Sequence, residues 1–165
     1  FDGIRYGKRQ NIEDGNLQNL YTNSRSLGFG DEVKQRIMLG AFSLSSGYVD
    51  AYYAKANLVR KKIQREFHEA FEKYDVLLSP TSPTTAFEIG SKIDDPVAMY
   101  LNDICTTSAN LAGIPGISIP VGLDSMGLPI GMQVLSSPKK EKSLFEAAML
   151  IEEHAGFKGA HYASC

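Results

Sequence analysis

Two charged residues lie beside apolar stretches of the sequence, and their types suit the recognition of an amino acid. Arg36 directly precedes residues 37–42, and Asp103 lies in residues 99–104. Charges in such surroundings are expected to be partly buried, and a buried charge must be paired or hydrogen-bonded. A guanidinium binds a carboxylate and a carboxylate binds an ammonium, so the two residues suit the two ends of a zwitterionic ligand. A simple salt bridge or a helix-cap contact is the alternative for each.

A third candidate is the polar loop at residues 79–84, with the sequence Ser-Pro-Thr-Ser-Pro-Thr. It follows a predicted strand, and ligands in α/β sheets usually bind beyond the carboxyl ends of strands. Its two prolines stiffen it and its four hydroxyls make it polar. A rigid connector without a ligand is the equally open alternative.

Other common site chemistries lack support in the sequence. No Gly-x-Ser-x-Gly elbow occurs, and His68, His154 and His161 have no evident Ser or Asp partner; we expect His68 and His154 to be solvated surface groups. The glycines at 3 and 7 do not form a phosphate loop, because the spacing is one residue short and no Ser or Thr follows the lysine. We predict neither a metal site nor a cofactor in this chain.

The composition of the 165 residues narrows the class of protein further. Seventeen Lys and Arg against nineteen Asp and Glu give a net charge of −2, which argues against a dedicated nucleic-acid binder. The basic run at residues 60–62 therefore predicts a solvated helix face, with a nucleic-acid contact as the minor alternative. No apolar run approaches the roughly 18 residues of a membrane span. Two cysteines, Cys105 and Cys165, fit a reducing compartment and no disulfide framework.

Hydrophobic periodicity and turn residues predict the elements that position these groups. We expect residues 1–30 to be irregular, Asp31 to cap a short helix through Met38, and one amphipathic helix to cover residues 48–74. A buried strand is predicted at residues 76–78, and Asp95-Pro96 should open a helix that carries residues 99–104. Two strands at 117–121 and 130–135 and a final helix at 141–154 complete the prediction.

Strands alternating with helices indicate an α/β fold with helices packed on a partial mixed or parallel β-sheet. Three strands are few for so many amphipathic helices. We therefore expect the rest of the sheet to lie upstream, and an unpaired sheet edge that favours self-association. Since Phe1 is not an initiator methionine, we also expect the chain to begin downstream of something.

Several stretches resemble the carboxy-terminal part of the glutaminase subunits of glutamyl-tRNA(Gln) amidotransferases, a branch of the amidase-signature family. The resemblance extends over about residues 1–155. The Pro-Thr loop and the Gly-Leu-Pro-Ile-Gly-Met-Gln stretch are typical of the whole family, whereas the Arg-Ile-Met-Leu-Gly and Asp-Asp-Pro…Met-Tyr-Leu…Asp-Ile stretches are similar to the glutaminase branch. The matching stretches are residues 1–7, 28–40, 50–53, 75–81, 94–104, 110–115 and 127–133.

The resemblance implies hydrolysis of the glutamine side-chain amide, with ammonia passing to the B and C subunits of the amidotransferase, where ATP activates glutamate on misacylated tRNA(Gln). In that family the nucleophile is a serine activated through a second, cis-bonded serine and a lysine. These residues lie in a Gly/Ser-rich stretch that has no counterpart here, because Ser45-Ser46 and Ser136-Ser137 lack such surroundings. We therefore expect residues 1–165 to be a carboxy-terminal fragment of one amidase-signature domain, with no catalytic residue and no activity alone.

The resemblance does imply residues of this chain that bind the substrate. Arg36 matches the family's clamp for the glutamine α-carboxylate, and Asp103 matches its acceptor for the α-amino group. It also implies a cytoplasmic protein without direct nucleic-acid or membrane contact. The alternatives are a fragment of another amidase-signature amide hydrolase, and a non-catalytic module that docks partner subunits.

Overall fold

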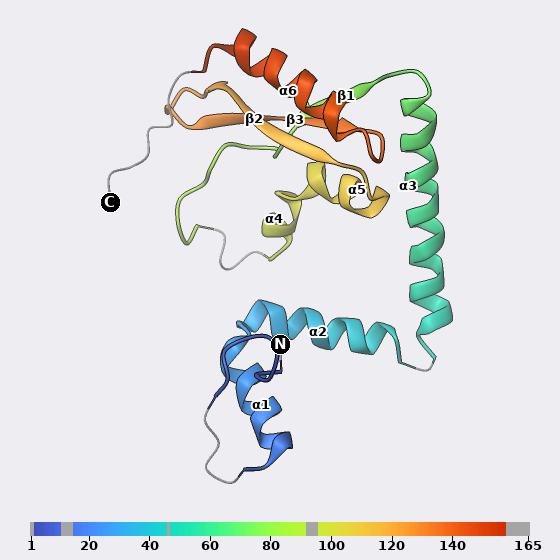
Figure 1. Ribbon diagram of the computed structural model, residues 1–165, viewed down its shortest axis with the longest axis vertical. Coiled ribbons are helices and arrows are strands. Elements are labelled where there is room, and N and C mark those ends of the chain that lie inside the picture. The colour runs from blue at the N-terminus through green and yellow to red at the C-terminus, as the bar shows by residue number, and fades with distance from the viewer. Residues whose placement is uncertain (1, 11–14, 46, 92–95, 158–165) are drawn as a thin grey trace. The chain divides into compact units, whose positions relative to one another are not determined.

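The computed structural model describes residues 2–10, 15–45, 47–91 and 96–157. The chain divides into two compact units, Phe1–Ala56 and Asn57–Cys165, and each is described by itself. Within the described residues there are six α-helices, one π-helical turn and three strands (Figure 1).

The first unit is helical where irregular structure was predicted. Helix α1 covers Leu17–Gly28, and the Asn16 side chain accepts a hydrogen bond from the Gln18 N–H, as expected of an N-cap. Leu20 and Ser24, four residues apart, are buried on one face of α1. The predicted irregular segment is confirmed for residues 2–10, which form no helix or strand, and is wrong for Leu17–Gly28, because Asn16 and this spacing were overlooked.

Helix α2 covers Asp31–Ser43, so it is longer than predicted. Its N-cap is Gly30, and Asp31 is the first helical residue rather than the cap. An acidic residue still suits this place, since carboxylates in the first turn are stabilised by the partial positive charge of the helix N-terminus.

The predicted long helix begins with a π-helical turn, η1, at Val49–Ala54 and continues as α3 at Lys55–Phe71. Tyr74 lies beyond the end of α3, so the predicted helix was too long at this end. In the second unit, the apolar side chains of Ile63, Phe67 and Phe71 are half-buried along α3. The carboxyl end of α5 meets this helix: Arg60 Nε donates to Leu111 O at 2.9 Å.

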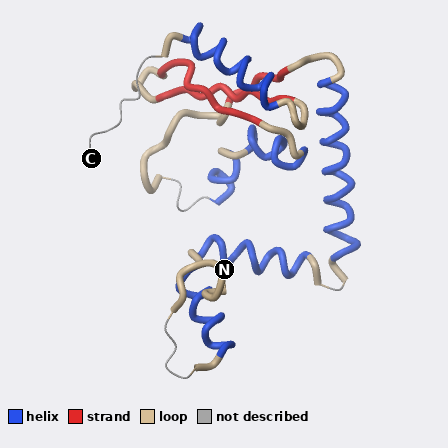
Figure 2. Tube along the Cα trace, viewed as in Figure 1, coloured by secondary structure: helices blue, strands red, loops and turns tan. Residues whose placement is uncertain are grey.

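The sheet of the second unit has the strand order β1-β3-β2, and Figure 2 shows its strands in red. Strand β1 covers Val76–Pro80, β2 covers Gly116–Leu123 and β3 covers Pro129–Ser136. Both pairings are antiparallel, so no parallel pair contributes among the described strands. The α/β fold class is confirmed. The predicted burial of β1 is not, since its residues are half-buried or exposed.

Helices cover both faces of this sheet (Figure 1). On one face lies α6, Glu141–Ala155, as predicted. On the other, the single helix predicted around residues 96–104 is divided into α4, Pro96–Leu101, and α5, Ile104–Ala112. The predicted Asp95 cap lies outside the described residues. Gly113 ends α5 with a left-handed φ of 73°, a conformation that favours glycine.

The core of the second unit lies between the sheet and α6. It is formed by four buried side chains, with Val134 wholly inaccessible; these are Ile119, Val134, Leu144 and Ala148. Burying each large aliphatic side chain contributes about 1.5–3 kcal/mol. The opposite face of the sheet carries Ser118 and Gln133, and a cavity opens on that side.

Candidate functional site

Asp103 occupies the tight turn between α4 and α5, at the N-cap position of α5. Its backbone oxygen accepts from the N–H groups of Thr106 and Thr107 at 3.1 and 2.9 Å, and from the Thr107 hydroxyl at 2.8 Å. The side chain makes no capping hydrogen bond. Among the described residues, the Asp103 carboxylate has no hydrogen-bond or ion-pair partner, so the turn fixes its backbone and leaves its charge available.

Arg36 lies in the middle of α2, in the first unit. Its Nε donates to Glu32 Oε1 at 2.8 Å, one helical turn earlier, and the side chain is 62% exposed. Asp103 is exposed as well. The predicted partial burial of both charges is therefore wrong for the described chain, because the apolar residues next to each charge in the sequence are themselves exposed and bury neither charge. The two residues belong to different units, and the prediction that they share a ligand stays a prediction.

The Ser-Pro-Thr loop is held to the sheet by hydroxyl hydrogen bonds. Thr81 Oγ1 lies 2.6 Å from Ser118 Oγ, and the Thr81 N–H donates to Gly131 O at 3.0 Å. Gly131 makes this approach possible, because a Cβ at that position would lie 2.9 Å from Thr81 Oγ1 and 3.0 Å from Ser118 Oγ. The predicted stiffness of the loop is therefore supported by contacts at its start, as well as by its prolines.

A cavity of about 230 Å³ opens between this loop, the sheet and α5. The polar part of its described lining is uncharged and comes from the loop, from strands β2 and β3, and from helix α5. The lining residues are Thr81, Thr106, Ala109, Asn110, Ile114, Gly116, Ile117, Ser118 and Gln133. Hydroxyl and amide groups donate and accept hydrogen bonds, so the cavity suits a neutral polar group; its described lining contains no ionised nucleophile or base.

Sequence reasoning missed most of this cavity. Thr106 and Asn110 are one helical turn apart, which places them on one face of α5. Ser118 and Gln133 are directly opposite each other in the register of β2 and β3. The helical spacing was visible in the sequence, whereas the register was not.

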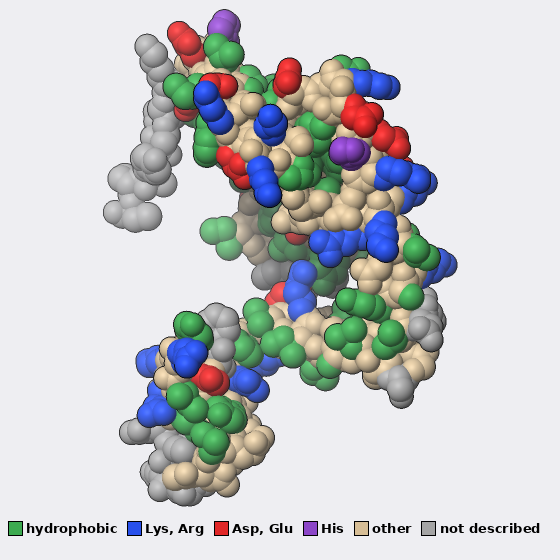
Figure 3. All heavy atoms as spheres, turned by 45° about the vertical axis from the view of Figure 1, so that its right-hand side comes forward, with side chains coloured by type: hydrophobic (Ala, Val, Ile, Leu, Met, Phe, Trp, Pro, Cys, Tyr) green, Lys and Arg blue, Asp and Glu red, His purple; other side chains and the backbone are tan. Residues whose placement is uncertain are grey.

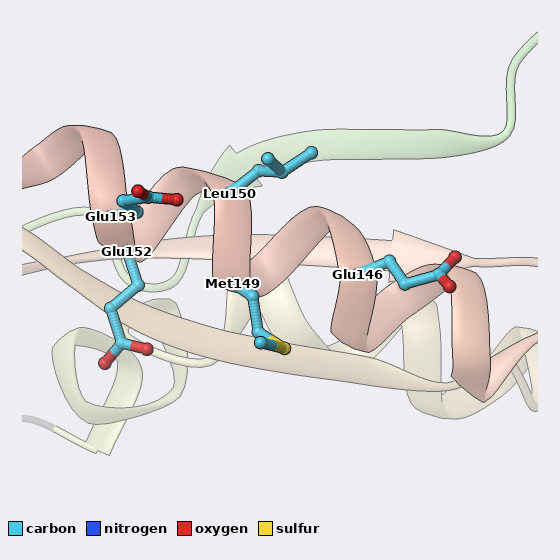
Figure 4. A pocket seen from close by; sticks show the side chains of 5 residues that line it. All are labelled: Glu146, Met149, Leu150, Glu152 and Glu153. Carbon is cyan, nitrogen blue, oxygen red and sulfur yellow. The ribbon is translucent and has the colours of Figure 1, made fainter.

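A second hollow, of about 580 Å³, lies on the surface of α6 (Figure 4). All five residues that line it come from this one helix; they are Glu146, Met149, Leu150, Glu152 and Glu153. Figure 4 shows that Glu146 points away from Glu152 and Glu153. The carboxylates therefore do not converge on a common point, and we do not assign a site here.

The described histidines are surface groups, as predicted. His68 Nε2 lies 3.8 Å from Glu72 Oε1 with its side chain 77% exposed, and the exposed His154 contacts Leu150 O through Nδ1. His161 lies outside the described residues. Within the ranges that the structure describes, no group of three or more His, Cys, Asp or Glu side chains is arranged to hold a metal ion. None of the helices described has both the length and the apolarity required to cross a membrane.

One carboxylate near the loop has an altered acidity. Asp124 turns the chain between β2 and β3, and the hydrogen bond from the Thr85 hydroxyl, at 2.6 Å, lowers its pKa. The backbone N–H groups of Leu128 and Met126 lower it further by donating to Oδ1. This carboxylate is thus committed to the hairpin turn and to fixing Thr85.

Residues 2–145 match the family model described as Amidase. This match covers most of the chain, which therefore belongs to the amidase family. The predicted resemblance to amidase-signature enzymes is confirmed.

Within the family, the chain is similar to proteins of one kind. It is 52% identical over 157 residues to the A subunit of glutamyl-tRNA(Gln) amidotransferase from Zymomonas mobilis, which covers 95% of this chain and 32% of the relative. The solved structure of the corresponding A subunit from Thermotoga maritima superposes with a TM-score of 0.62 at 45% identity, over 83% of this chain and 31% of that one. The chain thus spans about a third of the length of these relatives.

A more distant structure has the same fold. A 6-aminohexanoate cyclic dimer hydrolase superposes with a TM-score of 0.61 at 20% identity, over 82% of this chain and 32% of that one. At this identity the likeness concerns the fold alone.

Proposed function

We propose that this chain is the glutamine-binding, carboxy-terminal part of an amidotransferase glutaminase subunit, which supplies ammonia for converting Glu-tRNA(Gln) to Gln-tRNA(Gln). The observation that carries the proposal is the similarity to the A subunit of glutamyl-tRNA(Gln) amidotransferase, at 52% identity over 95% of the chain. In this proposal residues 1–165 form part of one amidase-signature domain. The serine nucleophile, the bridging serine and the lysine belong to a preceding segment.

The described contacts support a role for Asp103 in the grip on glutamine. Its carboxylate is exposed and makes no hydrogen bond or ion pair with a described residue, while four hydrogen bonds from Thr106 and Thr107 to its backbone oxygen hold the turn. A carboxylate on a fixed backbone accepts a hydrogen bond from an α-ammonium group without any ordering of the backbone on binding. Arg36 supplies the guanidinium for the α-carboxylate.

A substrate held at both ends of its amino-acid head is distinguished from a simple amide, because an amide without the head leaves the charged groups unpaired. Asp103 and Arg36 in this way select glutamine, and the preceding segment performs the hydrolysis. The ammonia passes to the B and C subunits of the amidotransferase, which use ATP, in the cytoplasm. This chain itself needs no cofactor and does not contact the tRNA.

The proposal is tested in the full-length protein with three amides, by measuring the release of ammonia. Glutaramate lacks the α-amino group of glutamine, and 4-aminobutanamide lacks the α-carboxylate. Asp103→Asn should lower kcat/KM for glutamine about 10- to 100-fold, the worth of a hydrogen bond to a charged group, and leave glutaramate unchanged. Arg36→Ala should do the same for glutamine and leave 4-aminobutanamide unchanged.

Equal losses on all three amides would contradict the proposed grip. A parent enzyme that hydrolyses acetamide as well as glutamine would favour another amidase-family hydrolase. The 165-residue chain alone should release no ammonia from glutamine. Ammonia release by this chain at an enzymatic rate would contradict the assignment of the nucleophile to a preceding segment.

A further inference from the structure

Gln133 is the central member of a polar row that crosses the sheet. It lies directly opposite Ser79 of β1 and directly opposite Ser118 of β2. Because residues opposite each other in a sheet point to the same face, this row lies on one face. The neighbouring Val134 belongs to the core under α6, so the row faces the other way, toward the cavity and α5.

The Gln133 side chain joins this face of the sheet to the start of α5. Only 6% of the residue is exposed. Its Nε2 donates to Ser79 Oγ at 3.0 Å and to the backbone oxygen of Cys105 at 3.0 Å. A carbonyl oxygen can only accept, so the contact with Cys105 fixes which end of the amide is the NH₂ group. Both hydrogens of that group are then used within the fold.

Cys105 is two residues beyond Asp103, in the first turn of α5. This turn is internally rigid, since the backbone oxygen of Asp103 accepts hydrogen bonds from both Thr106 and Thr107. A contact that fixes the Cys105 oxygen relative to the sheet therefore also fixes the backbone of Asp103. The Asp103 carboxylate has no described partner of its own, so its place depends on this backbone.

We infer that Gln133 is a positioning residue, which sets the place of the Asp103 carboxylate by tying the first turn of α5 to the sheet. The inference rests on the proposed function, in which that carboxylate accepts the α-amino group of glutamine. Misplacing a binding group by about 1 Å lowers the rate of an enzyme by up to about 100-fold. Loss of one buried hydrogen bond changes an equilibrium constant, such as that for binding, by about tenfold. The expected loss concerns glutamine and spares an amide that lacks the α-amino group.

The chain offers a matched control at the opposite end of the same helix. Gln64 of α3 donates through Nε2 to Ala112 O, at the last residue of α5, at 3.4 Å. Gln64→Met removes a hydrogen bond from a glutamine to α5, as Gln133→Met does, but far along the helix from Asp103. A general loosening of α5 would affect both variants, whereas positioning of Asp103 involves Gln133 alone.

The experiment compares Gln133→Met, Gln64→Met, Asp103→Asn and the double variant Gln133→Met/Asp103→Asn in the full-length protein, with glutamine and glutaramate as substrates. Methionine has nearly the volume of glutamine, so the core is disturbed little. Gln133→Met should raise KM for glutamine about tenfold and nearly retain kcat, while the kinetic constants for glutaramate stay unchanged. In the double variant, Gln133→Met should not raise KM for glutamine beyond the value of Asp103→Asn alone. Gln64→Met should behave as the parent. If Gln133→Met does not fold, Ser79→Ala, which removes the other partner of the amide, should give a smaller loss of the same kind.

The outcomes separate the two claims. If Asp103→Asn lowers kcat/KM for glutamine and for glutaramate equally, the proposed function fails, and the inference fails with it. In a second outcome, Asp103→Asn lowers kcat/KM for glutamine alone, while Gln133→Met or Ser79→Ala lowers kcat/KM equally for both substrates. That result would overturn the inference and leave the proposed function standing. An effect of Gln133→Met that persists in the double variant would likewise overturn it.

Discussion

The two units of the chain differ in how much apolar surface they bury within themselves. In the second unit, the sheet and α6 enclose Ile119, Val134, Leu144 and Ala148. In the described part of the first unit, Leu20 is the single buried apolar side chain, and α2 buries none. Apolar side chains lie at the surface where α2 runs (Figure 3); they include Val33, Ile37, Met38, Leu39 and Phe42.

Helices with similar apolar patterns thus make different contributions to stability. Both α2 and α6 carry apolar residues at helical spacing, but α6 packs against a sheet in its own unit, whereas the described part of the first unit contains no strand. Burial contributes most of the stability of a helix in a protein. Stability within this chain should therefore come mainly from the second unit, and substitutions can test that directly.

The largest expected effect is at the core beneath α6. Leu144 is 3% exposed, and Leu144→Ala should lower the free energy of unfolding by about 2–5 kcal/mol, through lost transfer energy and a residual cavity. Leu39→Ala is the control in α2, where the side chain is 63% exposed and the loss should stay within about 0.5 kcal/mol. Urea unfolding followed by circular dichroism measures both. Equal losses of unfolding free energy in the two variants would contradict the claim that the second unit provides most of the stability.

A smaller effect is expected where the loop approaches the sheet. Gly131→Ala places a Cβ against Thr81 Oγ1 and Ser118 Oγ, and should cost about 1–3 kcal/mol by overpacking. Gly122→Ala, in β2 of the same sheet, is the control, because no atom lies within 4 Å of its added Cβ. Thermal unfolding compares them, and the close approach of the loop would be refuted if the two variants were equally stable.

The next prediction concerns proton binding in the two units. The pKa of Asp124 lies below its ordinary value because of the Thr85 hydroxyl, whereas the lowered pKa of Asp2 depends first on the Ile4 N–H. Thr85→Val should raise the pKa of Asp124 toward its ordinary value and leave that of Asp2 unchanged. NMR titration of the two carboxyl groups measures this, and a raised Asp2 pKa would indicate a change that is not local.

The sign for stability follows from the same shift. Because the pKa of Asp124 is lower in the folded chain, the folded chain binds this proton less readily than the unfolded chain does. The contribution of Asp124 to the free energy of unfolding is therefore fully present above the unfolded pKa of about 3.9. It is lost as the pH falls through the folded pKa. Thr85→Val should therefore weaken the dependence of stability on pH below about 4. A parent and variant with the same acid transition would contradict this role of Asp124.

The smallest effect is expected at the ion pair of α2. Glu32 and Arg36 are both more than half exposed, so Glu32→Gln should cost only about 0.3–0.5 kcal/mol and less at high salt. Urea unfolding at low and high salt measures this. A loss above about 1 kcal/mol would mean that Glu32 stabilises the first unit through more than a solvated pair.

The sequence predicted the second unit better than the first, for a physical reason. The strands around 117–121 and 130–135 and the helix at 141–154 carry short periodic signals bounded by turn residues, and all three are confirmed. The break at Asp103 was missed because residues 96–112 are apolar enough for one continuous helix. The prediction that Arg36 and Asp103 are partly buried was wrong, because burial depends on what packs against a side chain. The neighbours in the sequence do not reveal that.

The role of Gln133 shows the same limit within the candidate site. Its motif was recognised as typical of the family, but its contact with Cys105 depends on the register of β3 and on where α5 lies above the sheet. Both are tertiary properties. Residue types at the site could be predicted from the sequence, whereas the contacts that hold them could not.

Each outer strand of the sheet carries a proline, Pro80 in β1 and Pro120 in β2. Proline lacks an N–H group, and within sheets it favours edge strands with its nitrogen toward solvent. A strand added to either side of the described sheet would meet a missing donor after a few residues, so these two prolines oppose the self-association expected from an unpaired edge. Replacing either proline with valine would restore that donor and remove this obstacle to strand addition.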